Sequence, residues 1–84
     1  MDEWRKEISE IDKKIIQLIR KRLDIVKNIG IYKKENGLPI IQPGQEDAVY
    51  KRIEKEAEKV NLNKEEVHGV WENLIKLSRK EQEK

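Results

Sequence analysis

The sequence predicts an all-α fold of three helices, one long and two shorter. Over the first 35 positions apolar side chains recur at alternating steps of four and three residues, the heptad spacing of a long helix with one apolar face. No segment shows the strict apolar and polar alternation that marks a half-buried strand. The composition agrees, because 43% of the residues are charged and 36% are hydrophobic, as expected for helices whose outer faces carry ion pairs.

The first helix is expected over residues 3–35. One position in its heptad spacing is filled by Arg22 instead of an apolar residue. The segment Asn36-Gly37-Leu38-Pro39 ends the helix, because glycine suits the left-handed position after a helix and proline cannot continue one. The apolar positions, which we call the apolar seam, are Trp4, Ile8, Ile11, Ile15, Leu18, Ile25, Ile29 and Tyr32.

Two shorter helices follow a loop at residues 39–44. Pro43 suits the first turn of the second helix, whose apolar line ends near residue 60. Asn63, with a glutamate three residues later, predicts the capped start of the third helix. The last residues, 79–84, are expected to fray.

Length and composition limit the class of protein. The 84 residues are expected to form a single domain, residues 1–84, with a thin core. No run approaches the roughly 20 apolar residues of a membrane span and no signal peptide is recognisable, so we expect a cytoplasmic protein. With no cysteine and one histidine, we expect no metal site and no cysteine nucleophile. The near balance of 19 basic and 17 acidic residues argues against a nucleic-acid partner.

The apolar seam needs a partner. Two shorter helices cannot cover a helix about 50 Å long within one chain. Small domains without disulfides or metals usually fold by exceptional helix packing or by oligomerising. We therefore predict an intertwined homodimer.

Arg22 is the most informative single residue, because a guanidinium within an apolar face is costly to bury unless something pairs with it. A salt bridge to Asp12, Asp24 or Glu46 could satisfy it. Alternatively, it could set the register of packed helices, or bind an anion in a pocket between helices. Lys33 lies three helical turns further along the same face, so the two cationic tips could converge on one small molecule.

Three more polar residues stand where apolar lines end, as groups that face a pocket between helices would. Taken singly, each could equally mark the point where its helix leaves the core. They are Glu46, Ser78 and Gln82.

The segment Trp4-Arg5-Lys6-Glu7-Ile8-Ser9-Glu10-Ile11-Asp12, followed by a heptad helix with Arg22, Gly30 and Lys33, resembles the all-helical chorismate mutases of the shikimate pathway. The resemblance covers nearly the whole chain. It implies an isomerase that converts chorismate to prephenate in phenylalanine and tyrosine biosynthesis, without a cofactor. It also implies an intertwined dimer in which each active site lies mainly in one chain and is completed by an arginine of the partner.

The resemblance assigns roles to the cations. Arg5, donated across the dimer interface, and Arg22 would bind the two substrate carboxylates, while Lys33 would contact the ether oxygen and a carboxylate. The reaction breaks a C–O bond as a C–C bond forms and transfers no proton. Catalysis would then come from holding the flexible dianion in its compact conformer and from stabilising negative charge on the ether oxygen.

By the same resemblance, Glu46 would lie near the ring hydroxyl, and Ser78 and Gln82 would form a pair on the third helix, with the glutamine also facing the ether oxygen. The loop departs from the family pattern, because Gln42 stands where Asp is common and Gln45 where Arg is common. An amide at Gln45 can donate a hydrogen bond but carries no charge. The ring carboxylate would be bound more weakly or depend more on the partner's arginine.

Two other functions fit the same residues. An isochorismate-pyruvate lyase resembles these mutases and uses a similar cationic pocket. A helical interaction module without catalysis would use Arg22 to set the register of a dimer. The retained Glu46 and Gln82 favour the mutase over the lyase.

Overall fold

The computed structural model describes residues 1–84 and contains three helices and no strand, which confirms the predicted fold class. Helix α1 spans Asp2–Glu35, α2 spans Pro43–Lys59 and α3 spans Lys64–Glu83. The molecule measures 53 × 24 × 15 Å, and its longest dimension is set by α1 alone. None of the helices is long and apolar enough to cross a bilayer.

The connections between the helices follow the predicted signals. Gly37 has a φ of 64°, a left-handed conformation that glycine adopts without steric cost. Pro43 is the first residue of α2. The side chain of Asn63 accepts a 2.9 Å hydrogen bond from the backbone N–H of Glu66 and so caps the start of α3.

The prediction that residues 79–84 fray is wrong, because α3 continues to Glu83. Arg20 of α1 reaches the buried Glu81 at 3.4 Å. The Lys34 ammonium donates a 3.1 Å hydrogen bond to the backbone carbonyl of Glu83. These contacts between distant parts of the chain hold the last turn of α3 against α1.

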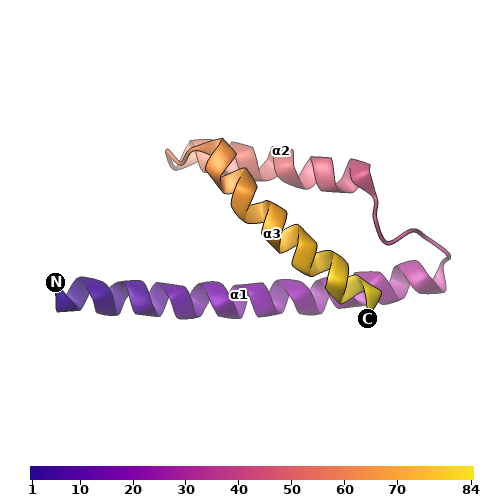
Figure 1. Cartoon of the computed structure of the whole chain (residues 1–84), viewed down its shortest axis with the longest axis horizontal. Helices are drawn as coiled ribbons and strands as arrows, with labels where there is room; N and C mark the ends of the chain where they lie inside the picture. The colour runs from indigo at the N-terminus through magenta and orange to yellow at the C-terminus, as the bar shows by residue number, and fades with distance from the viewer.

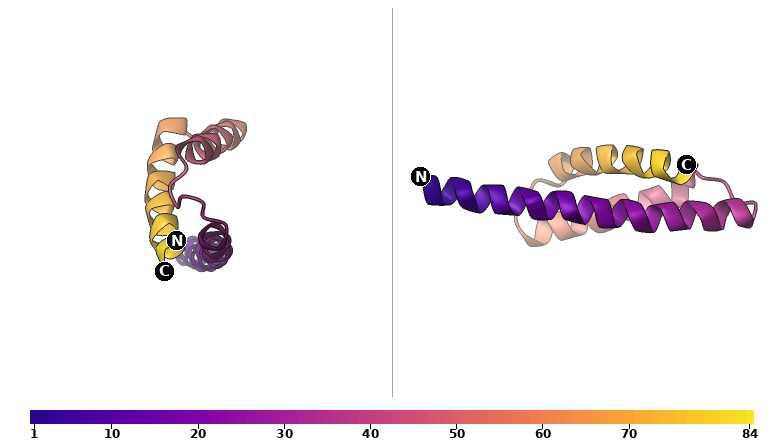
Figure 2. Two further views of the ribbon diagram at one scale, coloured as in Figure 1. Left: turned by 90° about the vertical axis from the view of Figure 1, so that its right-hand side faces the viewer. Right: turned by 90° about the horizontal axis from the view of Figure 1, so that it is seen from below.

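α3 is the central element of the fold. It packs against both α1 and α2, whereas α1 and α2 make no packing contact with each other. Figure 1 shows α3 running diagonally from the end of α2 to the C-terminal half of α1, and Figure 2 shows α1 and α2 on the same side of α3, near its opposite ends. Only six residues are buried, namely Val26, Gly30, Ala57, Ile75, Ser78 and Glu81.

The crossing of α1 and α3 depends on Gly30. A Cβ atom added at Gly30 would lie 2.7 Å from both the Cα and the carbonyl oxygen of Gln82, far inside van der Waals contact. Because these are backbone atoms, a small side-chain adjustment cannot relieve the clash. Glycine at this position therefore brings the last turns of α3 close to the turn of α1 that carries Lys33.

The N-terminal turns of α1 extend past the other two helices (Figure 1). Every residue from 1 to 18 is exposed, including seam residues such as Trp4 at 65% and Leu18 at 62%. The chain exposes 6984 Å² in total, whereas a compact monomer of this mass would expose about 5,300 Å². The apolar seam is thus largely uncovered within one chain.

Candidate active site

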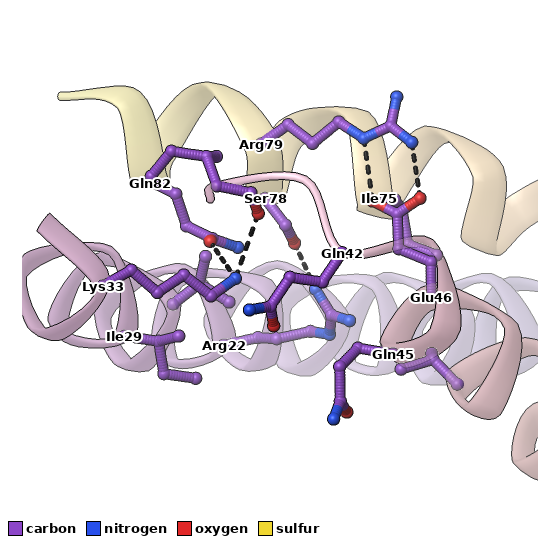
Figure 3. A pocket seen from close by; sticks show the side chains of 13 residues that line it. Arg22, Ile29, Lys33, Gln42, Gln45, Glu46, Ile75, Ser78, Arg79 and Gln82 are labelled. Carbon is purple, nitrogen blue, oxygen red and sulfur yellow. Dashed lines mark hydrogen bonds and ion pairs between the residues drawn. The ribbon is translucent and has the colours of Figure 1, made fainter. Parts of the chain in front are cut away.

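A cavity of about 270 Å³ opens where α1, α3 and the start of α2 meet. Its size is close to that of small-molecule sites. Apolar side chains form part of the wall, and a group of polar side chains forms the rest (Figure 3). These polar residues are Arg22, Lys33, Gln42, Gln45, Glu46, Ser78, Arg79 and Gln82.

Arg22 enters the cavity from α1 and is held by α3. Its Nη1 donates a hydrogen bond to the buried Ser78 hydroxyl, which donates in turn to the backbone carbonyl of Leu74 at 2.9 Å. Burial, and secondarily repulsion from Arg52, lowers the pKa of Arg22 below its ordinary value. Serine therefore orients the guanidinium and supplies no negative charge, so the other nitrogens of Arg22 remain available to an anion.

None of the three carboxylates that could pair with Arg22 forms a salt bridge with it. Asp24 and Glu46 each pair with a different arginine. Asp12 is exposed and forms no ion pair. The internal salt-bridge interpretation of Arg22 is therefore wrong, and its charge stays uncompensated within the chain.

Lys33 joins α1 to both the loop and α3. Its ammonium donates to the side-chain oxygen of Gln82 at 2.7 Å and to the backbone carbonyl of Ile40 at 3.0 Å. An ammonium can only donate, so it fixes the orientation of the Gln82 amide. The NH₂ group of Gln82 is thereby left to donate to a ligand.

Glu46 and Arg79 form a two-point ion pair at the start of α2 (Figure 3). Arg79 Nε donates to Glu46 Oε2 at 2.8 Å and Nη2 donates to Oε1. Hydrogen bonding by Arg79 holds the pKa of Glu46 below its ordinary 4.5, against an opposing effect of desolvation, and Lys33 lowers it further. Glu46 is therefore a carboxylate at neutral pH.

Arg79 is absent from the predicted site because it falls in the segment expected to fray. A signal was nonetheless present in the sequence. Arg79 follows Ile75 by four residues and precedes Gln82 by three, which is the spacing of neighbours on one helix face.

The cavity brings together seven of the eight predicted site residues. Gln42 is half-buried and Gln45 is exposed, and neither side chain bonds to another residue. Arg5 is the exception. It is exposed near the start of α1, about 25 Å along the helix axis from Arg22, so it does not reach the cavity of its own chain. No group of three or more His, Asp or Glu residues is placed to hold a metal ion.

Comparison with known proteins gives matches over almost the whole chain. The family described as "Chorismate mutase type II" matches residues 4–83. The chorismate mutase of Methanocaldococcus jannaschii is 42% identical over 86% of this chain and 65% of its own length. The T-protein of Haemophilus influenzae is 33% identical over 93% of this chain. The bifunctional chorismate mutase/prephenate dehydratase of Aquifex aeolicus is 36% identical over 94% of this chain.

The chain is shorter than these relatives. It spans 21% of the T-protein and 21% of the bifunctional enzyme. No solved structure matches the chain.

Proposed function

The chain belongs to the chorismate mutase type II family, and from this premise we propose that it isomerises chorismate to prephenate. The observation that carries the proposal is the meeting of Arg22 and Lys33 in one cavity, each without a carboxylate partner. Two uncompensated cations suit a dianionic substrate. The proposal includes a single domain over residues 1–84 that serves phenylalanine and tyrosine biosynthesis in the cytoplasm.

The proposed mechanism needs neither a nucleophile nor a base. Arg22 clamps one carboxylate through the nitrogens that Ser78 leaves free, and so favours the compact conformer in which the reacting carbons lie close. Lys33 and the NH₂ group of Gln82 donate to the ether oxygen, where negative charge grows as the C–O bond breaks. These donors contribute most in the transition state, which is the condition for raising the rate.

Three neutral or acidic residues complete the proposed site. Glu46 accepts a hydrogen bond from the ring hydroxyl, because it is the only carboxylate that lines the cavity and would repel the substrate carboxylates. Gln42 and Gln45 lie beside it and offer amide donors without charge. Because Lys33 serves the ether oxygen and Arg79 is paired with Glu46, the second substrate carboxylate is left without a cation from this chain.

We propose that Arg5 of a second chain fills that place in an intertwined homodimer. Three observations support this proposal: the seam is exposed, the chain exposes about a third more surface than a compact monomer, and Arg5 lies far from its own cavity. Pairing two seams would cover apolar surface and carry each exposed N-terminal half of α1 toward the other chain.

The direct test is identification of the product formed from chorismate and from isochorismate. We expect prephenate from chorismate and no salicylate or pyruvate from isochorismate. The opposite pattern would identify the lyase, and no reaction with either substrate would favour the interaction module.

A matched pair of variants tests whether the cavity is the site. Lys33→Ala removes one of the two uncompensated cations and should lower kcat/KM by about 100-fold or more, the usual effect of losing a transition-state donor. Lys27→Ala removes an exposed lysine of the same helix that has no ion pair, and should leave kcat/KM unchanged. Sedimentation should show the same oligomer for both.

A further inference from the structure

The Arg79–Glu46 pair carries a further inference, which rests on the proposed function. Its two side chains come from α3 and α2 and are 39% and 21% exposed, so the pair forms a partly exposed end of the cavity wall between these helices (Figure 3). Gln42 and Gln45, the nearest cavity residues in the chain, are neutral. The charge at this end of the cavity is therefore set by the Arg79 guanidinium and the Glu46 carboxylate, with a smaller contribution from Lys33.

The chemistry of chorismate indicates which group this end would receive. The molecule carries two carboxylates, an ether oxygen and one hydrogen-bond donor, the ring hydroxyl. The carboxylates and the ether oxygen need donors, so only the hydroxyl suits an acceptor such as Glu46. Each carboxylate oxygen has more than one lone pair, so Glu46 can accept from Arg79 and from the hydroxyl at the same time.

The ion pair with Arg79 changes whether the Glu46 carboxylate binds an ammonium or a hydroxyl more strongly. A carboxylate without a partner would attract an ammonium more strongly than a hydroxyl, because a full charge interacts more strongly than a dipole. The guanidinium balances the charge of Glu46 and would repel a second cation placed beside it. The ring hydroxyl is neutral, so the guanidinium does not repel it and weakens its hydrogen bond to Glu46 only a little.

We propose that Arg79 is a positioning residue that determines specificity: by pairing with Glu46 it makes the cavity select a ring hydroxyl over a ring ammonium. The proposal predicts a preference for chorismate over 4-amino-4-deoxychorismate, the analogue in which an amine replaces that hydroxyl. The amine is protonated at neutral pH, as alkyl amines are.

The test measures kcat/KM for both substrates at neutral pH in the wild-type protein and in two variants of Arg79. Arg79→Gln removes the charge but keeps a donor, and should shift the preference toward the amino substrate by about fivefold or more, the effect of one charge at this range. Arg79→Lys keeps the charge and should retain the preference even if kcat/KM falls. Lys80→Gln removes an exposed charge from the next residue of α3 and should change nothing.

Glu46→Gln gives a second measurement of the substrate preference, which does not depend on whether Arg79→Gln folds. It removes the carboxylate and leaves the guanidinium, so the preference for the hydroxyl should rise. An unchanged substrate ratio in folded Arg79→Gln, or an equal shift in Arg79→Lys, would overturn the inference while leaving the mutase assignment intact. A wild-type protein that converts neither substrate would overturn the proposed function itself.

Discussion

The ionisation of Glu46 sets the expected pH dependence of activity. Hydrogen bonding by Arg79 lowers the pKa of this carboxyl below 4.5, so the group stays ionised through neutrality and gains a proton only in acid. If Glu46 had to donate a proton to the ether oxygen, raising the pH would slow the reaction. The lowered pKa instead favours a role as an acceptor from the ring hydroxyl.

We therefore expect kcat/KM for chorismate to stay flat through neutrality and to fall only below about pH 4.5. Arg79→Gln replaces the charged two-point hydrogen bond to Glu46 with a weaker neutral one, so the pKa of Glu46 should rise and the fall of the rate in acid should move to higher pH. A pH–rate profile of both proteins on the same substrate batch separates this effect from protonation of the substrate. A wild-type rate that falls steadily above pH 6 would contradict the assignment of Glu46 as an acceptor.

Arg22 illustrates a conflict between stability and function. A half-buried guanidinium without a carboxylate partner costs free energy, and replacing such a group with an apolar one of similar length is often neutral or stabilising. We expect Arg22→Met to lower kcat/KM by about 100-fold or more, while Tm stays the same or rises. The Ser78 hydroxyl keeps its hydrogen bond to the backbone carbonyl of Leu74, so the substitution leaves no buried polar group without a partner.

Lys27→Met is the control for that experiment, because it removes an exposed lysine of the same helix. Neither Tm nor kcat/KM should change appreciably. A Tm for Arg22→Met several degrees below that of Lys27→Met would mean that Arg22 serves mainly to hold α1 against α3.

Individual site residues were predictable to different degrees. Arg22 stood out because it interrupts an apolar line, and Lys33 because it shares that face. Arg79 gave a weaker signal, since an arginine near a chain end is ordinary on a solvated helix. Its importance depends on the packing of α3 against α2, which places it opposite Glu46 and is not encoded in local periodicity.

The helices were predictable because their signals are local. The 4-3 spacing, Gly37, Pro43 and Asn63 each act within a few residues, and the structure follows all of them. The end of α3 was not predictable in the same way. Its stability comes from Arg20 and Lys34, which lie about 50 or more residues away in sequence.

The crossing of α1 and α3 provides a test of helix packing. Gly30→Ala places a Cβ 2.7 Å from the backbone of Gln82, so the helices must separate. We expect a loss of about 1–3 kcal/mol in the free energy of unfolding, with a fall in kcat/KM because the Gln82 amide moves from Lys33. Chemical denaturation and steady-state kinetics on the same preparation measure both effects.

Gly69→Ala is the matched control, because a Cβ on Gly69, which lies within α3, meets nothing within 4 Å. It should stabilise the protein by up to about 1 kcal/mol through the better helix propensity of alanine. Equal effects of the two substitutions would show that Gly30 does not set the helix crossing.

The exposed seam links the stability of the chain to its proposed activity. Only six residues are buried, so a single chain has little core to offset the entropy lost on folding. Two chains joined along α1 would cover the seam. The same arrangement would bring the Arg5 guanidinium, which has no partner in its own chain, to the cavity of the other.

A mixing experiment tests whether Arg5 acts across the interface. Arg5→Ala and Arg22→Ala should each be nearly inactive, because each dimer lacks one carboxylate clamp in both cavities. If the two variants are unfolded together and refolded, half of the dimers should contain one chain of each kind. One cavity of such a dimer has an intact Arg22 and an intact Arg5 from the partner, so about a quarter of wild-type activity should return. If Arg5 served its own chain's cavity, the mixture would stay inactive, since no chain would carry both arginines.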